Sequence, residues 1–191
     1  MRGSVPALLV GVTMLAAITA CSESEGGTPT PGTATSTTEP SSSKPSSARP
    51  REIRLDGKDA CQLLTAEQRP ALGIDRAGEP VEAPTFKAKG CSWIVTGASS
   101  RLIPVTSEGI EVWTGGKRTG QAEKTDPIAT FPAISVTVPS DQDRCDVMVD
   151  VADGQYLLAT FSVSPSFRDR FPKPCDGARQ LAEAAMQNLV K

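Results

Sequence analysis

The chain has 191 residues, a formal net charge of −2 and no histidine. The lack of histidine removes the commonest general base and the commonest transition-metal ligand, and no basic patch of the kind that binds nucleic acid stands out. We therefore expect no cofactor and no nucleic-acid partner. Five cysteines are the main guide to function, because an odd number needs an explanation in a secreted protein.

The N-terminus has the pattern of a bacterial secretion signal. Arg2 gives it a positive start, and the largely apolar residues 5–18 are about as long as the core of a signal peptide and short for a membrane span. They end in Ile18-Thr19-Ala20-Cys21, which resembles the lipobox of bacterial lipoprotein precursors. The resemblance implies cleavage after residue 20 and a diacylglycerol on Cys21, which would hold the protein on the outer face of the cell membrane. The alternative is an ordinary secretion signal followed by a chance cysteine.

Residues 22–50 consist mainly of Ser, Thr, Pro and Gly and contain no aromatic residue and no Leu, Ile or Val. Such a segment cannot bury enough apolar surface to offset the entropy lost on ordering. Together with the lipidated cysteine we expect a disordered tether over residues 21–50, which holds the rest of the chain away from the membrane. Residues 51–191 are then expected to form one globular domain.

Short helical pieces are predicted at the start of this domain. Residues 60–64 predict a helical turn, and Thr65 with Gln68 three residues later has the spacing of a capping box for a second helix. Pro70 limits that helix, and Gly73 can end it. Residues 75–90 predict a loop with one short strand at most.

Strands are predicted in the middle of the domain, at residues 91–95, 102–105, 109–113 and 133–138, with a break at Gly115-Gly116. The clearest pattern is a hairpin. Residues 145–151 and 156–163 alternate apolar and other side chains, and Asp153-Gly154 between them suits a type I′ turn.

A helix is predicted after Pro174, with an apolar face made of Ala178, Leu181, Ala182, Ala185 and Leu189. The order of helix, antiparallel strands and helix predicts an α+β fold. We expect an antiparallel sheet of about five or six strands, with an N-terminal and a C-terminal helix packed on one face.

If Cys21 carries lipid, four cysteines remain for the domain, namely Cys61, Cys91, Cys145 and Cys175. Disulfides form in the oxidising environment of a secreted protein, but four cysteines allow three connectivities and spacing alone does not decide between them. We favour Cys61–Cys91 and Cys145–Cys175, because each bond would join a terminal helix to a strand. Each would close about thirty residues and contribute roughly 3–4 kcal/mol. A metal site or a redox role is the alternative, but the chain has no Cys-x-x-Cys pair.

Several short motifs are similar to those of one known family. They are residues 59–68 (DACQLLTAEQ) with 72–73 (LG), 90–93 (GCSW), 149–155 (VDVADGQ), and 175–178 (CDGA) with 181–183 (LAE). With the lipobox, their order and spacing resemble an actinobacterial lipoprotein family catalogued as domain of unknown function 3558, over nearly all of residues 55–190. Two positions depart from the family pattern: Pro70, where a helix usually continues, and Ala60, where proline is frequent. The resemblance implies a secreted, membrane-anchored, non-catalytic domain with two disulfides, and it implies no ligand.

Four carboxylates near the hairpin, Asp141, Asp143, Asp146 and Asp150, are candidates for a calcium site or a carboxylate-based hydrolase. The pattern lacks the glycine and the terminal glutamate of an EF-hand loop, and nothing in it indicates the carboxylate separation that glycoside hydrolysis needs. If the strand starts at Cys145, Asp146 and Asp150 share its solvent face. We therefore expect a solvated acidic edge and no metal.

The two tryptophans have different surroundings in the sequence. Trp93 follows Cys91 and is expected in the core beside a disulfide, whereas Trp113 precedes a flexible Gly-Gly pair and is the best candidate for an exposed contact with a sugar or a partner protein. We expect a non-catalytic module that engages a cell-envelope component or a partner protein through its sheet face or the loops of residues 97–120. The alternative is a carrier or sensor for a small apolar ligand, and an enzyme that uses carboxylates alone ranks last.

Overall fold

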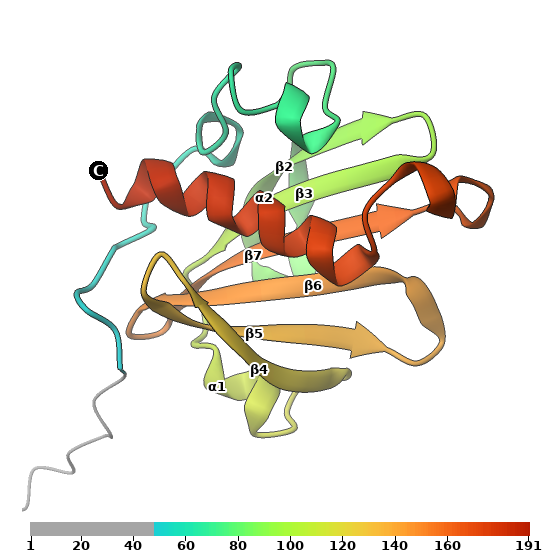
Figure 1. The fold of residues 1–191 in the computed structure, drawn as a ribbon. Helices are drawn as coiled ribbons and strands as arrows, with labels where there is room; N and C mark the ends of the chain where they lie inside the picture. The colour runs from blue at the N-terminus through green and yellow to red at the C-terminus, as the bar shows by residue number, and fades with distance from the viewer. Residues whose placement is uncertain (1–47) are drawn as a thin grey trace, which may run out of the picture. The chain divides into compact units, whose positions relative to one another are not determined.

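One antiparallel sheet of seven strands organises the computed structural model, which describes residues 48–191 (Figure 1). The chain divides into two units, Met1–Ser42 and Ser43–Lys191, and every described residue belongs to the second. The predicted secretion signal, Cys21 and nearly all of the predicted tether lie outside the described residues. The strands are β1 (Glu79–Ala83), β2 (Ala88–Val95), β3 (Ala98–Val105), β4 (Gln121–Ile128), β5 (Phe131–Val138), β6 (Asp141–Ala152) and β7 (Gln155–Val163).

The strand order is β1-β2-β3-β7-β6-β5-β4, so β3 and β4 are neighbours in the chain but not in the sheet. The connection between them, residues 106–120, contains the short helix α1 (Glu111–Thr114). The long helix α2 (Pro174–Leu189) lies across β6 and β7 on the other side of the sheet (Figure 1). We call the side covered by α2 the first face and the opposite side the second face. Four short 3-10 turns complete the described residues: η1 (Ala60–Gln62), η2 (Pro70–Leu72), η3 (Pro84–Phe86) and η4 (Pro165–Arg170).

The first face carries the larger hydrophobic core. Side chains of α2 at helical spacing pack on alternate side chains of the central strands, as the periodicities of helix and strand require. The close approach of the helix depends on Gly177, because a Cβ there would lie 2.5 Å from the Phe161 ring. The buried members include Leu181, Ala182, Ala185 and Met186 of α2 and Val147, Val149, Leu157 and Phe161 of the strands.

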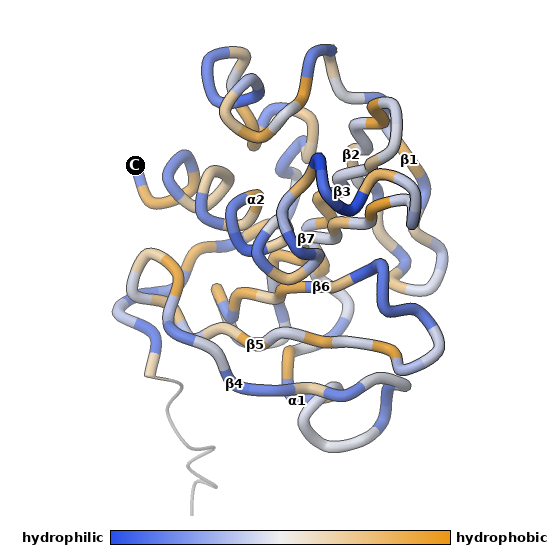
Figure 2. Tube along the Cα trace, turned by 45° about the vertical axis from the view of Figure 1, so that its right-hand side comes forward, coloured by the Kyte–Doolittle hydropathy of each residue, from blue (hydrophilic) through white to orange (hydrophobic). Residues whose placement is uncertain are grey.

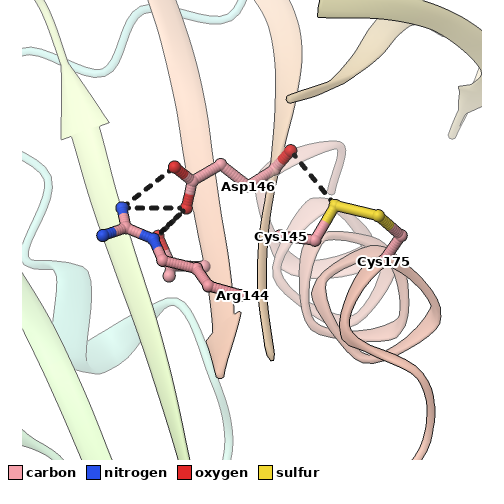
Figure 3. Close-up of a disulfide and its surroundings, with 5 residues drawn as sticks. Arg144, Cys145, Asp146 and Cys175 are labelled. Atoms are coloured by element: carbon pink, nitrogen blue, oxygen red, sulfur yellow. Dashed lines mark hydrogen bonds and ion pairs between the residues drawn. A yellow bond between two sulfur atoms is a disulfide. The ribbon is translucent and has the colours of Figure 1, made fainter. Parts of the chain in front are cut away.

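Two disulfides join segments that contribute to this first-face core. Cys61–Cys91 connects η1 to β2, and Cys145–Cys175 connects β6 to the first turn of α2. This is the pairing that the sequence favoured. Figure 3 shows Cys145 pointing toward α2 while its neighbours Arg144 and Asp146 point to the other side of the strand, as strand alternation dictates.

A second, smaller core lies on the second face. Met148, Tyr156 and Leu158 of the central hairpin pack there against Ile103, Ile134 and the residues around α1. Strands β6 and β7 are therefore buried on both sides over most of their length. The prediction that helices cover only one face of the sheet is wrong for this reason: the 106–120 connection covers part of the other face.

The structure corrects the predicted number of strands. The sheet has seven strands because β4 was not predicted at all, whereas β1 is the one short strand that the prediction allowed within residues 75–90. Figure 2 shows that β4 is mostly hydrophilic, which is typical of an edge strand and hides the usual alternation. The segment predicted as extended at residues 109–113 instead contributes to α1.

The predicted N-terminal helix is absent from the described residues. Residues 60–64 form only η1 and its cap, and the second predicted helix is reduced to turns and η2. Half of the capping box is present, because the backbone N–H of Thr65 donates to Gln68 Oε1 at 3.0 Å. Pro70, which lacks a backbone N–H, prevents the helix from continuing.

The β6–β7 hairpin forms where the sequence predicts it, but its turn differs. Gly154 has φ 70°, whereas Asp153 is not among the residues with positive φ, and the register shifts between Asp150 and Ala152. A type I′ turn needs two residues with positive φ, so the turn is of the bulged kind that places one glycine in the left-handed region.

Candidate functional site

A groove of about 360 Å³ opens on the second face between α1 and the β4–β5 hairpin. Its volume falls within the range of about 300–1,000 Å³ that is usual for small-molecule sites. The walls are mainly apolar. They are formed by Ile110 and Thr114 of α1 and by Pro127, Thr130, Pro132 and Ile134 of the hairpin, with Lys124 and Asp150 as the charged members of the lining.

The α1 wall is held in place by Trp113. This side chain is only 9% exposed, its Nε1 donates to Tyr156 Oη at 3.1 Å, and its ring lies 6.4 Å from that of Phe86. Ile110 and Thr114 are four residues apart, so they share one side of the helical turn and reach the groove together. The expectation that Trp113 is exposed is therefore wrong, since the residue belongs to the second core, and its contact with a sugar or a partner protein stays a prediction.

A hydrogen-bond network extends from this tryptophan through the 106–120 connection. Tyr156 Oη donates to Glu108 Oε1 at 2.9 Å, and Arg118 Nη2 donates to Glu108 Oε2 at 2.6 Å. Burial raises the pKa of Tyr156, so its hydroxyl stays protonated and can donate and accept at once. The network fixes both ends of the connection that carries α1. Sequence reasoning missed these residues; the one available signal was that Tyr156 is the only tyrosine in the chain.

The hairpin wall contains an unusual turn. Ala129 (φ 49°) and Thr130 (φ 72°) link Ile128 to Phe131, both with left-handed backbones although neither is glycine. Such residues carry conformational strain of order 1–3 kcal/mol each and persist where the surroundings impose them. The surroundings here include α2, because Arg179 Nη1 donates to Thr125 Oγ1 at 2.8 Å. A strained turn therefore forms one rim of the groove.

The described chain begins at the same groove. Ala48 lines it, and the next residue, Arg49, donates from Nη1 to Asp150 Oδ1 at 2.6 Å and from Nη2 to Asp153. The Arg49 side chain is only 10% exposed. Ile53 also binds this segment to the sheet, because its backbone N–H donates to the carbonyl oxygen of Val151 in β6 at 2.8 Å. Residues 48 and 49, which fall within the segment predicted as tether, thus contact the domain beside the groove.

The four candidate carboxylates do not form one site. Asp143 pairs with Arg168, Asp146 with Arg144, and Asp150 with Arg49. The hydrogen bond from Arg168 is the largest cause of a lowered pKa at Asp143. Within residues 48–191 no group of His, Cys, Asp and Glu side chains is arranged to hold a metal ion.

The expectation that Asp146 and Asp150 lie on a solvent-exposed strand face is wrong. They are 7% and 8% exposed, because the second face is covered beside them. Asp146 accepts hydrogen bonds from Thr160 Oγ1 at 2.6 Å and from Arg144 Nη2 at 2.9 Å (Figure 3). Trp93, by contrast, is buried in the first core as predicted.

A larger cavity of about 520 Å³ lies at the opposite end of the sheet, beside the start of α2. Its walls are more polar and include Gln142, Arg144 and Lys173. Among the described residues, neither helix has the length and hydropathy that crossing a membrane requires.

Fold and site together define an α+β domain with a seven-stranded antiparallel sheet, two disulfides and one apolar groove on the second face. The family model described as "Protein of unknown function (DUF3558)" matches residues 16–188, which is most of the chain. The protein belongs to this family. Neither a curated protein nor a solved structure matches the chain.

Proposed function

We propose that the protein is a lipid-anchored, non-catalytic binding protein on the extracytoplasmic side of the cell membrane, and that the groove takes a small apolar ligand. One observation carries the proposal: a mainly apolar groove of about 360 Å³ is open between α1 and the β4–β5 hairpin, beside the two packed cores. A hydrophobic surface that water can reach favours a ligand that removes it from water.

The charges at the groove support binding without catalysis. Lys124 and Asp150 are the charged residues of the lining, and Asp150 is neutralised by Arg49. A general acid and base need two titratable groups that face the same reacting atom, and the carboxylate at this groove is already paired with a guanidinium. The groove therefore offers shape and apolar contact.

The anchoring part of the proposal rests on the sequence before the domain. The lipobox at Ile18-Thr19-Ala20-Cys21 supplies the lipid site, and the Ser/Thr/Pro-rich residues 22–50 supply the tether. Substitution Cys21→Ser tests it by cell fractionation. We expect the folded domain to leave the membrane fraction or its precursor to remain unprocessed, whereas a processed protein that stays at the membrane would refute lipid anchoring.

The binding part is tested with N-phenyl-1-naphthylamine, a neutral apolar probe whose fluorescence rises in apolar sites. The Cys21→Ser protein is titrated alone and with Ile110→Asn, which makes one groove wall polar. We expect about tenfold weaker binding, because the lost apolar contact amounts to about 1.4 kcal/mol.

The matched control is Ile94→Asn, the same change at an isoleucine on β2 that is 60% exposed and does not line the groove. This control should leave the affinity unchanged. Equal effects of the two substitutions, or no saturable binding at all, would refute the groove as the ligand site.

A second candidate function is contact with a cell-envelope component or a partner protein through the outer half of the second face. Ile94 is the one large hydrophobic side chain among residues 48–191 that is strongly exposed, and its paired neighbour across the sheet is Ser99. Pull-down from envelope fractions with the unchanged protein and with Ile94→Asp tests it. Retention of the same partners by both proteins would exclude this surface.

A further inference from the structure

We propose that the groove selects amphiphiles with an apolar chain and a monoanionic head group, and that Lys124 binds the head group. The inference deepens the proposed function, because it rests on the groove as the ligand site and names the class of ligand. Apolar walls alone would accept any hydrophobic molecule of suitable size. The charges of the lining are what distinguish one such molecule from another.

Lys124 is the charge of the lining that is open to a ligand. The described lining contains two charged residues, and the other one, Asp150, accepts a hydrogen bond from Arg49 Nη1 at 2.6 Å. Within residues 48–191 no hydrogen bond or ion pair engages the ammonium group of Lys124, and this residue is exposed. A ligand that enters the groove therefore meets one available cation.

The register of the sheet places Lys124 at the outer side of the groove. It pairs with Ile134 of β5, which lines the same groove, and paired residues of neighbouring strands lie on the same face of a sheet. Because β4 is the edge strand, Lys124 lies between this apolar wall and solvent. An alkyl chain that packs on Ile134 can therefore end beside the ammonium group.

The exposure of Lys124 suits a charged head group. Full burial of a head group without a partner would cost more than the apolar contact of the chain returns. Beside an exposed lysine, an anionic head group keeps part of its hydration and gains an opposite charge. A cationic head group would be repelled there, and a neutral one would gain little. The site therefore favours anionic amphiphiles over cationic ones with the same chain.

Nearby carboxylates do not cancel this preference. Asp150 lies on β6, two strands away from β4, and two strand spacings amount to about 10 Å. This separation exceeds the Debye length of about 8 Å at physiological ionic strength, so repulsion from Asp150 is largely screened. Arg49 weakens it further by pairing with the carboxylate. Two carboxylates of β4 itself, Glu123 and Asp126, do not line the groove.

Three ligands that share one alkyl chain test the inference: decanoate, decan-1-ol and decyltrimethylammonium. Each is titrated calorimetrically at neutral pH, below the concentration at which it aggregates, into the Cys21→Ser protein with and without Lys124→Gln. Exposed ion pairs of this kind change affinities by about two- to fivefold. We expect Lys124→Gln to weaken decanoate binding by this factor, to leave decan-1-ol unchanged and to tighten the binding of the cation slightly.

Three further substitutions separate the charge from the apolar wall. Lys58→Gln is the matched control, the same change at an exposed lysine that does not line the groove, and it should leave all three affinities unchanged. Lys124→Arg keeps the charge and should keep the affinity for decanoate. Ile110→Asn changes the wall and should weaken all three ligands alike.

The outcomes distinguish this inference from the proposed function. If Lys124→Gln weakens decanoate and decan-1-ol by the same factor, or affects decanoate no more than Lys58→Gln does, the role of Lys124 is overturned. Saturable binding of decan-1-ol would in that case leave the apolar groove as a ligand site. If none of the three ligands shows saturable binding, the proposed function fails and this inference fails with it.

Discussion

The two faces of the sheet are covered in different ways. The first face is closed by a helix of sixteen residues and by the N-terminal segment, and both disulfides join elements of this side. The second face is covered over part of its area by the 106–120 connection, which hydrogen bonds and a buried tryptophan hold in place. The first face supplies most of the buried apolar surface, and the second leaves a groove.

The difference between the two faces explains why strained and polar elements can surround the groove. A turn with two left-handed non-glycine residues and a network of Glu, Tyr, Trp and Arg are costly if they are incompletely satisfied. A well-packed core on the other side of the same strands can offset these costs. A substitution on one face should therefore leave the properties of the other face unchanged.

Removal of the Cys145–Cys175 disulfide should have the largest effect and should act through the first face. The double substitution Cys145→Ala/Cys175→Ala opens a loop of 30 residues, and the chain-entropy account gives a loss of about 3–4 kcal/mol in the free energy of unfolding. Denaturant unfolding measures it. A loss below about 1 kcal/mol would show that the bond constrains little. Probe affinity at the groove should be unchanged where the protein remains folded.

Tyr156→Phe should affect the second face. It removes the hydroxyl that bridges Trp113 and Glu108 and leaves buried polar groups without their partner, at a cost of about 1–3 kcal/mol. We expect hydrogen exchange to speed up in residues 110–114 but not in α2. Trp113→Phe breaks the same bond from the other side, so the two losses should not add. Additive losses, or faster exchange in α2, would contradict the separation of the faces.

Thr130→Gly should stabilise the protein by about 1 kcal/mol, because glycine adopts the left-handed region without the cost that a β-branched residue carries there. Thr137→Gly is the control, since the same change in extended strand β5 should destabilise. Thermal unfolding distinguishes the two. Destabilisation by both substitutions would mean that the turn is not strained.

The smallest effect concerns pH. The hydrogen bond from Arg168 lowers the pKa of Asp143, so the ionised form is favoured in the folded state. The contribution of this pair is complete above the ordinary carboxyl value of 3.8 and is lost as the pH falls through the lower pKa of the folded protein. Arg168→Gln should therefore lower the melting temperature slightly at neutral pH and make no difference in strong acid. A difference that persists in acid would refute the assignment.

The sequence predicted the parts of the fold that local periodicity determines. The β6–β7 hairpin, the helix after Pro174 and the cysteine pairing that joins them are present. The failed predictions concern features that depend on tertiary packing. β4 is a hydrophilic edge strand without a clear apolar alternation, and the exposure of Trp113 depends on which segments cover it. Periodicity shows which side of a strand is apolar, but the covering of the second face depends on where a 15-residue connection crosses the sheet.

The groove could not be predicted from the sequence for the same reason. Its walls come from residues 110–114, the β4–β5 hairpin and Asp150, and they meet only because β4 pairs at the far edge of the sheet. Nothing local marks Ile110 or Pro132 as a binding residue. The one signal near the groove was Trp113, which is buried in the second core and not exposed as expected.

Whether the second face holds the ligand site is tested by titrating the Cys21→Ser protein with N-phenyl-1-naphthylamine and following its two-dimensional NMR spectrum. We expect saturable shifts at the amides of Ile110, Thr114 and Ile134, with the amides of α2 unaffected. Shifts concentrated at Gln142 and Lys173, beside the larger polar cavity, or an absence of saturable shifts, would contradict it.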